Sequence, residues 1–127
     1  MTEHSPDCRG HFWRDASGRL VYELHRVAGA DYAAVCDLVR RRFRLQPSGD
    51  RAVGLDEIFQ EYGSGSGAIS LEWDNWTELS VVAKDAESEP LAREIGAFLG
   101  SAPEIDGSLR ATYAVTRRWP DREGARA

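Results

Sequence analysis

The sequence predicts an α+β fold in which an antiparallel sheet carries two helices on one face. Residues 20–25 and 78–83 alternate between two sets of side chains with the period of a β-strand. Residues 31–44 and 87–100 instead repeat apolar side chains at helical spacing. At 127 residues the chain has the length of one domain.

The N-terminal part predicts a hairpin followed by a helix. Residues 11–25 contain two short strands that turn at Ala16-Ser17-Gly18. The helix over 31–44 has Asp31 as its expected N-cap, and arginines crowd its last turn, where positive charge suits the helix dipole. Its apolar face comprises Tyr32, Val35, Cys36, Val39 and Phe43.

Residues 44–67 are predicted to be a long insertion before the next strand. Within it, a short helix is expected over residues 55–62, because four apolar residues fall at positions i, i+3, i+4 and i+7. The stretch GSGSG at 63–67 predicts a flexible joint.

Residues 69–83 predict a hairpin whose turn contains an odd number of residues. Its inward-facing apolar side chains form two sets: Ile69, Leu71 and Trp73, and Leu79, Val81 and Ala83. The two sets share one face only if Trp73 lies opposite Leu79, and a two-residue turn would instead place Trp73 opposite Glu78. The loop is therefore either 75–77 or 74–78, and Asn75 is a residue that can take the positive-φ conformation such a turn often demands.

This register determines where the residues around the turn lie. Asp74 and Glu78 would lie near each other as like charges, and Trp73 would enter the core. Trp76 would be at the tip, where it either folds back onto the domain or projects into solvent.

The remaining elements complete the predicted topology. Pro90 belongs in the first turn of the 87–100 helix, and residues 108–118 alternate like a final strand. The order β-α-β-β-α-β matches the ferredoxin-like plan, with residues 44–67 as an insertion. We expect one domain over 11–119, with flexible ends at 1–10 and 120–127.

The net charge of −5 is distributed unevenly. Residues 1–50 sum to +1, residues 51–106 to −9 and residues 107–127 to +3. The acidic middle would repel phosphate backbones, so we expect no nucleic-acid partner. No apolar run has the length of a membrane span, and the first residues lack a secretory signal. We therefore expect a cytoplasmic protein with no membrane partner.

No metal, cofactor or catalytic residue is predicted. Cys8 and Cys36 are expected to be free thiols. Cys8 and His11 have the spacing of half a zinc site, but the sequence contains no second close-spaced pair. His25 has no evident nucleophile or acid to work with, which favours a surface histidine.

These observations favour a small acidic protein-binding module without catalysis. Its docking surface would contain Trp76 with its neighbours Asp74, Asn75, Glu78 and Glu72, because tryptophan is enriched at binding hot spots and carboxylates suit a basic partner. An inhibitor of the immunity or antitoxin type would have this charge.

Two alternative interpretations remain. The chain could be a small-molecule-binding domain or an enzyme, with residues 44–67 acting as a lid over the sheet. It could also be a homodimer joined through an open sheet face or an edge strand.

Overall fold

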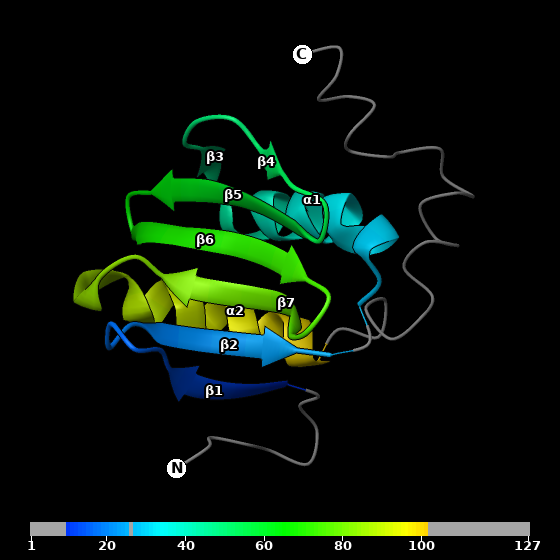
Figure 1. Ribbon diagram of the computed structural model, residues 1–127. Helices are drawn as coiled ribbons and strands as arrows, with labels where there is room; N and C mark the ends of the chain where they lie inside the picture. The colour runs from blue at the N-terminus through cyan, green and yellow to red at the C-terminus, as the bar shows by residue number, and fades with distance from the viewer. Residues whose placement is uncertain (1–9, 26, 102–127) are drawn as a thin grey trace.

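The structure, a computed structural model, describes residues 10–25 and 27–101, which form one antiparallel sheet and two α-helices (Figure 1). Both helices lie on the same face of the sheet, as predicted (Figure 1). The strands are β1 (Gly10–Arg14), β2 (Leu20–Leu24), β3 (Gln46–Pro47), β4 (Ala52–Val53), β5 (Glu57–Ser64), β6 (Gly67–Asp74) and β7 (Glu78–Ala83). The helices are α1 (Tyr32–Phe43) and α2 (Glu89–Ser101), each preceded by a short 3₁₀ turn, η1 (Gly29–Asp31) and η2 (Ala86–Ser88).

The strand order is β1-β2-β7-β6-β5-β3, and β4 also pairs with β5. This order does not clearly match the ferredoxin-like plan, because two strands precede α1 and five lie between the helices. The strand predicted over 108–118 lies outside the described residues. What holds is the coarser prediction of an α+β fold with an antiparallel sheet.

The interpretation of residues 44–67 as an insertion is wrong, because this segment supplies β3, β4 and β5 and so extends the sheet (Figure 1). The helix expected over 55–62 is wrong: residues 57–62 lie in β5, and residues 55 and 56 lie in the turn before it. Ile58 and Tyr62 point toward the helices and Phe59 points away, so the apolar residues also satisfy a two-residue period. Pairing with the eight residues of β6 decides between the two patterns.

The predicted flexible joint is a tight turn. Ser64 pairs with Gly67, which leaves only residues 65 and 66 to connect β5 with β6. Gly67 has a φ of 142°, and a Cβ atom there would lie 2.7 Å from the hydroxyl oxygen of Ser88. Both the backbone conformation and the packing therefore require glycine at this position.

The register predicted for the central hairpin is confirmed. Trp73 pairs with Leu79, Leu71 with Val81 and Ile69 with Ala83. The loop is residues 75–77, since Asp74 pairs with Glu78. The inward-facing side chains of β6 and β7 then share the helix-covered face, where Leu71, Leu79 and Val81 are fully buried.

The two helices and the first hairpin also follow the prediction closely. The hairpin of β1 and β2 turns over residues 15–19, and Gly18 has a φ of 82°. Asp31 directly precedes α1, but its side chain makes no capping hydrogen bond. No helix among residues 10–25 and 27–101 is long and apolar enough to cross a membrane.

Candidate docking surface at the hairpin tip

The loop between β6 and β7 is held by the carboxylate of Asp74. Its Oδ1 atom accepts hydrogen bonds from the backbone N–H groups of Trp76, at 2.8 Å, and of Thr77, at 2.7 Å. Its Oδ2 atom accepts a third from the hydroxyl of Thr77, at 3.0 Å. Burial alone would raise the pKa of Asp74, but these hydrogen bonds lower it overall. The loop that carries Trp76 is thus anchored at several points.

The residue with positive φ in this loop is Glu78, at 64°, rather than Asn75, the residue considered for this conformation. In a three-residue hairpin loop the left-handed conformation commonly falls on the residue that re-enters the strand. The carboxylate of Glu78 turns toward the end of β2, where it accepts a hydrogen bond from the N–H of Val27 at 3.1 Å. Asp74 and Glu78 lie opposite each other, as predicted, but each carboxylate has its own donors.

Trp73 lies near the end of the interior strand β6 and packs, partly buried, against the core. Its indole packs against the apolar core and its Nε1–H donates a hydrogen bond of 2.7 Å to the carbonyl of Val27. Gly29 lies beneath the ring, where an added Cβ atom would stand 3.2 Å from the indole. The prediction that one indole is in the core while its neighbour is at the tip is borne out.

A second turn lies beside the tip loop. The N–H of Gly54 donates a hydrogen bond of 2.7 Å to the carbonyl of Glu57, which closes the turn between β4 and β5. Asn75 donates a hydrogen bond of 2.7 Å from Nδ2 to Oδ1 of Asp56 in that turn. The neighbours of these two residues, Leu55 and Trp76, are therefore brought to the same end of the sheet.

Two large apolar side chains project from these turns into solvent. Trp76 is 77% exposed and Leu55 is 102% exposed. Of the two arrangements considered for Trp76, the exposed one is observed. We call Leu55, Asp56, Glu57, Asp74, Asn75 and Trp76 the tip surface.

The carboxylates of the tip surface have no basic partner among residues 10–25 and 27–101. Glu57 and Asp74 lie directly opposite each other on β5 and β6, which is an unfavourable arrangement for like charges. Among the residues that the structure describes, neither these two nor Asp56 forms an ion pair with lysine, arginine or histidine. Their negative charge is left uncompensated within this part of the chain.

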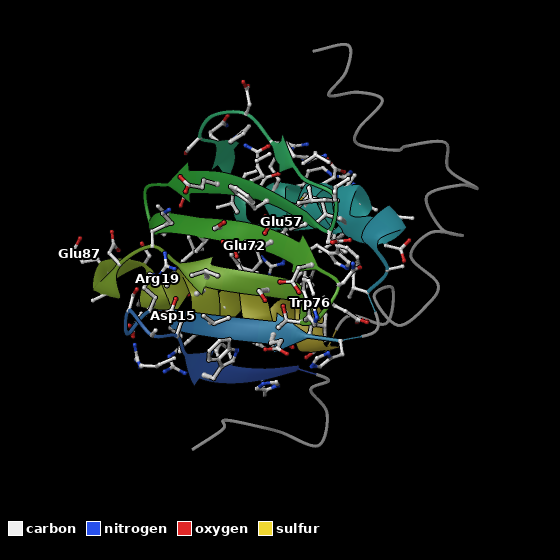
Figure 2. All side chains as sticks on the ribbon, viewed as in Figure 1. Asp15, Arg19, Glu57, Glu72, Trp76 and Glu87 are labelled. Atoms are coloured by element: carbon white, nitrogen blue, oxygen red, sulfur yellow. The ribbon has the colours of Figure 1, made fainter. Side chains whose placement is uncertain are left out.

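The tip surface continues onto the face of the sheet that the helices leave open. Glu72, labelled on β6 in Figure 2, pairs with Phe59 on β5. Both alternate with core residues and so point away from the helices, and Phe59 is 41% exposed. Glu72 likewise makes no ion pair among the described residues. On this face too, an exposed aromatic ring, Phe59, lies opposite a carboxylate, Glu72, that has no ion pair among the described residues.

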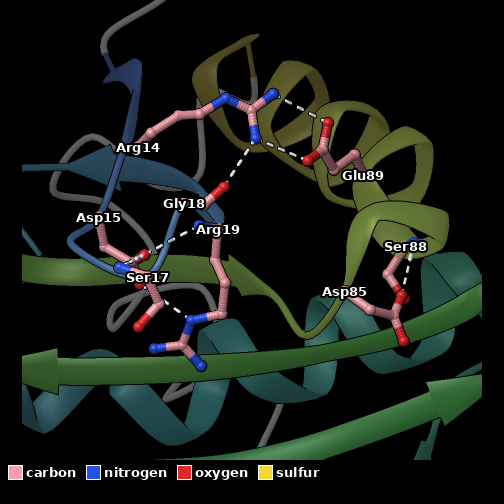
Figure 3. Close-up of polar contacts among 8 residues, drawn as sticks. All are labelled: Arg14, Asp15, Ser17, Gly18, Arg19, Asp85, Ser88 and Glu89. Atoms are coloured by element: carbon pink, nitrogen blue, oxygen red, sulfur yellow. Dashed lines mark hydrogen bonds and ion pairs between the residues drawn. The ribbon is translucent and has the colours of Figure 1, made fainter.

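The opposite end of the sheet differs, because two of its carboxylates are neutralised (Figure 3). Both oxygens of Glu89 accept hydrogen bonds from Arg14, at 2.7 and 3.0 Å. Asp15 pairs with Arg19 at 3.0 Å. Glu87, at that end and away from Trp76 in Figure 2, is exposed. Trp76 and Leu55, the two most exposed large apolar side chains among the described residues, both lie at the tip end.

The predicted site residues separate into three groups. Asp74, Asn75 and Trp76 come together at the tip, and Glu72 lies on the adjoining open face. Glu78 lies opposite Asp74 at the start of β7, and its carboxylate accepts a hydrogen bond from the N–H of Val27. Because sequence reasoning treated residues 55–62 as a helix with a buried apolar stripe, it did not place four residues in the site: Leu55, Asp56, Glu57 and Phe59.

Cys36, the cysteine within the described residues, does not provide a reactive group. Cys36 is buried against the sheet with a free thiol, and burial raises its pKa to about 11. Burial also raises the pKa values of Tyr32 and Tyr62 beside it. The thiol is thus protonated at neutral pH and closed off from solvent, which is the environment of an inert structural cysteine.

The two described histidines share one carboxylate on the open face. His25 Nε2 lies 2.9 Å from Glu23, and His11 Nε2 lies 3.9 Å from the other oxygen. Within the described ranges, no group of three or more histidine, cysteine, aspartate or glutamate side chains could hold a metal ion. Cys8, the other half of the spacing considered for zinc, lies outside those ranges.

Comparison with protein-family models, with curated proteins and with solved structures gives no significant match to this chain.

Proposed function

We propose that this chain is a protein-binding module that docks a basic partner protein through the tip surface, without catalysis. The observation that carries the proposal is the pairing of an exposed indole, Trp76, with carboxylates that have no cation among the described residues.

The apolar part of the surface supports a protein partner. Tryptophan is the residue type most enriched at interface hot spots, where it fills a pocket on the partner. Leu55 adds a second exposed apolar side chain from the neighbouring turn. The hydrogen bonds of Asp74 hold the loop in one conformation before binding. The loss of conformational entropy in this loop on binding would therefore be small.

The charge of the surface supports a basic partner. Glu57 and Asp74 repel each other in the free protein, and a cation from a partner would relieve this repulsion. Complementary charge also raises the rate of association and discriminates against acidic proteins. A natural class of basic protein is one that binds nucleic acid, so the finer proposal is an inhibitor of the immunity or antitoxin type.

The test is affinity capture with matched variants, followed by measurement with the isolated partner. Wild-type protein, Trp76→Ala, Glu57→Lys and Glu87→Lys are each immobilised and exposed to native lysate at low and high salt. Glu87 is the control, because it is an exposed acid at the opposite end of the sheet (Figure 2).

The proposal expects a basic protein that binds wild type and Glu87→Lys but is lost with Trp76→Ala and Glu57→Lys. The dissociation constant of the purified pair should rise with salt, because exposed charges are screened. A captured protein that binds all four variants equally at both salt concentrations would refute docking at the tip.

A further inference from the structure

We infer that the group the tip surface recognises on its partner is an arginine side chain, whose guanidinium stacks on the indole of Trp76 and pairs with a neighbouring carboxylate. This inference rests on the proposed function and specifies the chemistry of the same site.

Trp76 offers a stacking face that is both exposed and held in place. The indole is 77% exposed, while the backbone on either side of it is fixed by Asp74. The indole is the aromatic ring that binds cations best, and arginine is the cation found most often over such rings in proteins. The described core already holds this geometry, since Arg51 lies 5.3 Å over the ring of Tyr32.

A carboxylate suited to a guanidinium contacts the residue next to Trp76 in the chain. Asp56 receives a hydrogen bond at Oδ1 from Asn75, the residue next to Trp76, and no hydrogen bond from the described residues reaches its Oδ2. Glu57, the following residue, forms no ion pair in the described part of the chain. A planar guanidinium can donate to a carboxylate through its edge while its face rests on an aromatic ring.

Arginine fits this arrangement better than lysine. The ammonium of lysine is a strongly hydrated point charge, which gains from the carboxylates but little from stacking. The two cations should therefore respond differently to removal of the indole and similarly to removal of a carboxylate. This difference separates the inference from the general attraction of an acidic surface for basic proteins.

The test uses the full chain and two fluorescein-labelled homopeptides of equal length, one of arginine and one of lysine. Binding is followed by anisotropy at low salt for wild type, Trp76→Ala, Glu57→Gln and the control Glu87→Gln. We expect the arginine peptide to bind wild type about 3- to 10-fold more tightly than the lysine peptide, and Trp76→Ala to remove that preference. Glu57→Gln should weaken both peptides, and Glu87→Gln should weaken neither.

Two other outcomes would overturn the inference and can be told apart. If both peptides bind equally, and Glu57→Gln weakens them while Trp76→Ala has no effect, the arginine assignment fails and charge-driven docking survives. If neither peptide binds, or binding ignores every substitution at the tip, both the inference and the proposed function fail.

Discussion

Asn75 donates a hydrogen bond of 2.7 Å to the carboxylate of Asp56, and this contact joins two turns that are separated by 19 residues in the chain. One turn carries Leu55 and the other carries Trp76, the two large exposed side chains of the tip surface. The acids around them, Asp56, Glu57 and Asp74, form no ion pair with a basic residue in the described part of the chain. Such an arrangement suits binding better than it suits folding.

The cost to folding can be measured at Glu57. Because Glu57 lies opposite Asp74, neutralising it in Glu57→Gln should stabilise the protein by about 0.2–1 kcal/mol. The matched substitution Glu87→Gln, at an exposed position at the other end of the sheet, should leave stability nearly unchanged. Urea unfolding at pH 7 compares the three proteins, and an equal or lower midpoint for Glu57→Gln would contradict the repulsion.

Asp74 should be required for the shape of the tip loop. Asp74→Ala leaves the N–H groups of Trp76 and Thr77 without their shared acceptor, which should cost about 1–2 kcal/mol. Hydrogen exchange at these two amides should accelerate in the variant, while exchange in β2 should remain at the wild-type rate. Unchanged protection of both amides would mean that the loop does not depend on this carboxylate.

The contribution of Asp74 to stability should depend on pH in the acidic range. Because the pKa of Asp74 is lowered in the folded protein, its contribution is fully present above the ordinary value of 3.8 and is lost as pH falls through the folded value. The difference in unfolding free energy between wild type and Asp74→Asn should therefore shrink at acidic pH below that value. Urea titrations from neutral to acidic pH provide the measurement.

Glu78 combines an unfavourable backbone conformation with a useful side chain. Its φ of 64° is costly for any residue with a Cβ atom, while its carboxylate holds the N–H of Val27. Glu78→Ala keeps the backbone cost and loses the hydrogen bond, whereas Glu78→Gly loses the same hydrogen bond but also relieves the backbone cost. The glycine variant should be more stable than the alanine variant by about 1 kcal/mol in thermal or urea unfolding. The reverse order would exclude a left-handed conformation at this position.

Cys36 should react slowly in the folded protein. Burial raises the pKa of its thiol from 9.0 to about 11, which lowers the thiolate fraction about 100-fold below pH 9. In a Cys8→Ser background, alkylation by iodoacetamide at pH 8 should be slower than in urea by at least this factor. The stability that the protonated thiol contributes is present below pH 9 and is lost as the pH rises toward 11. Rapid alkylation of the native protein would contradict the buried position.

The sequence identified the central hairpin because only one register places all its apolar side chains on one face. Trp73 must then oppose Leu79, and Trp76 must be at the tip. The direction of the Trp76 side chain could not be predicted in the same way. It depends on tertiary packing around the loop, where Asn75 contacts Asp56 from a different strand connection.

Residues 55–62 show why the other half of the site was missed. Leu55, Ile58, Phe59 and Tyr62 satisfy the spacing of a helix, yet Ile58 and Tyr62 also satisfy that of a strand. Only pairing with β6 decides between them, and that pairing is a tertiary contact. The correct pattern moves Leu55 from a supposed core stripe to a fully exposed turn.

The most direct test of the central claim is ¹⁹F NMR of protein labelled with 5-fluorotryptophan, with each signal assigned by a Trp→Phe substitution. The signal of Trp76 should show a solvent isotope shift between H₂O and D₂O close to that of the unfolded chain, and Trp73 should show a much smaller one. When the basic partner is added, the signal of Trp76 should move and lose this solvent shift. A Trp76 signal that is shielded from solvent in the free protein, or unchanged by the partner, would contradict docking through the tip surface.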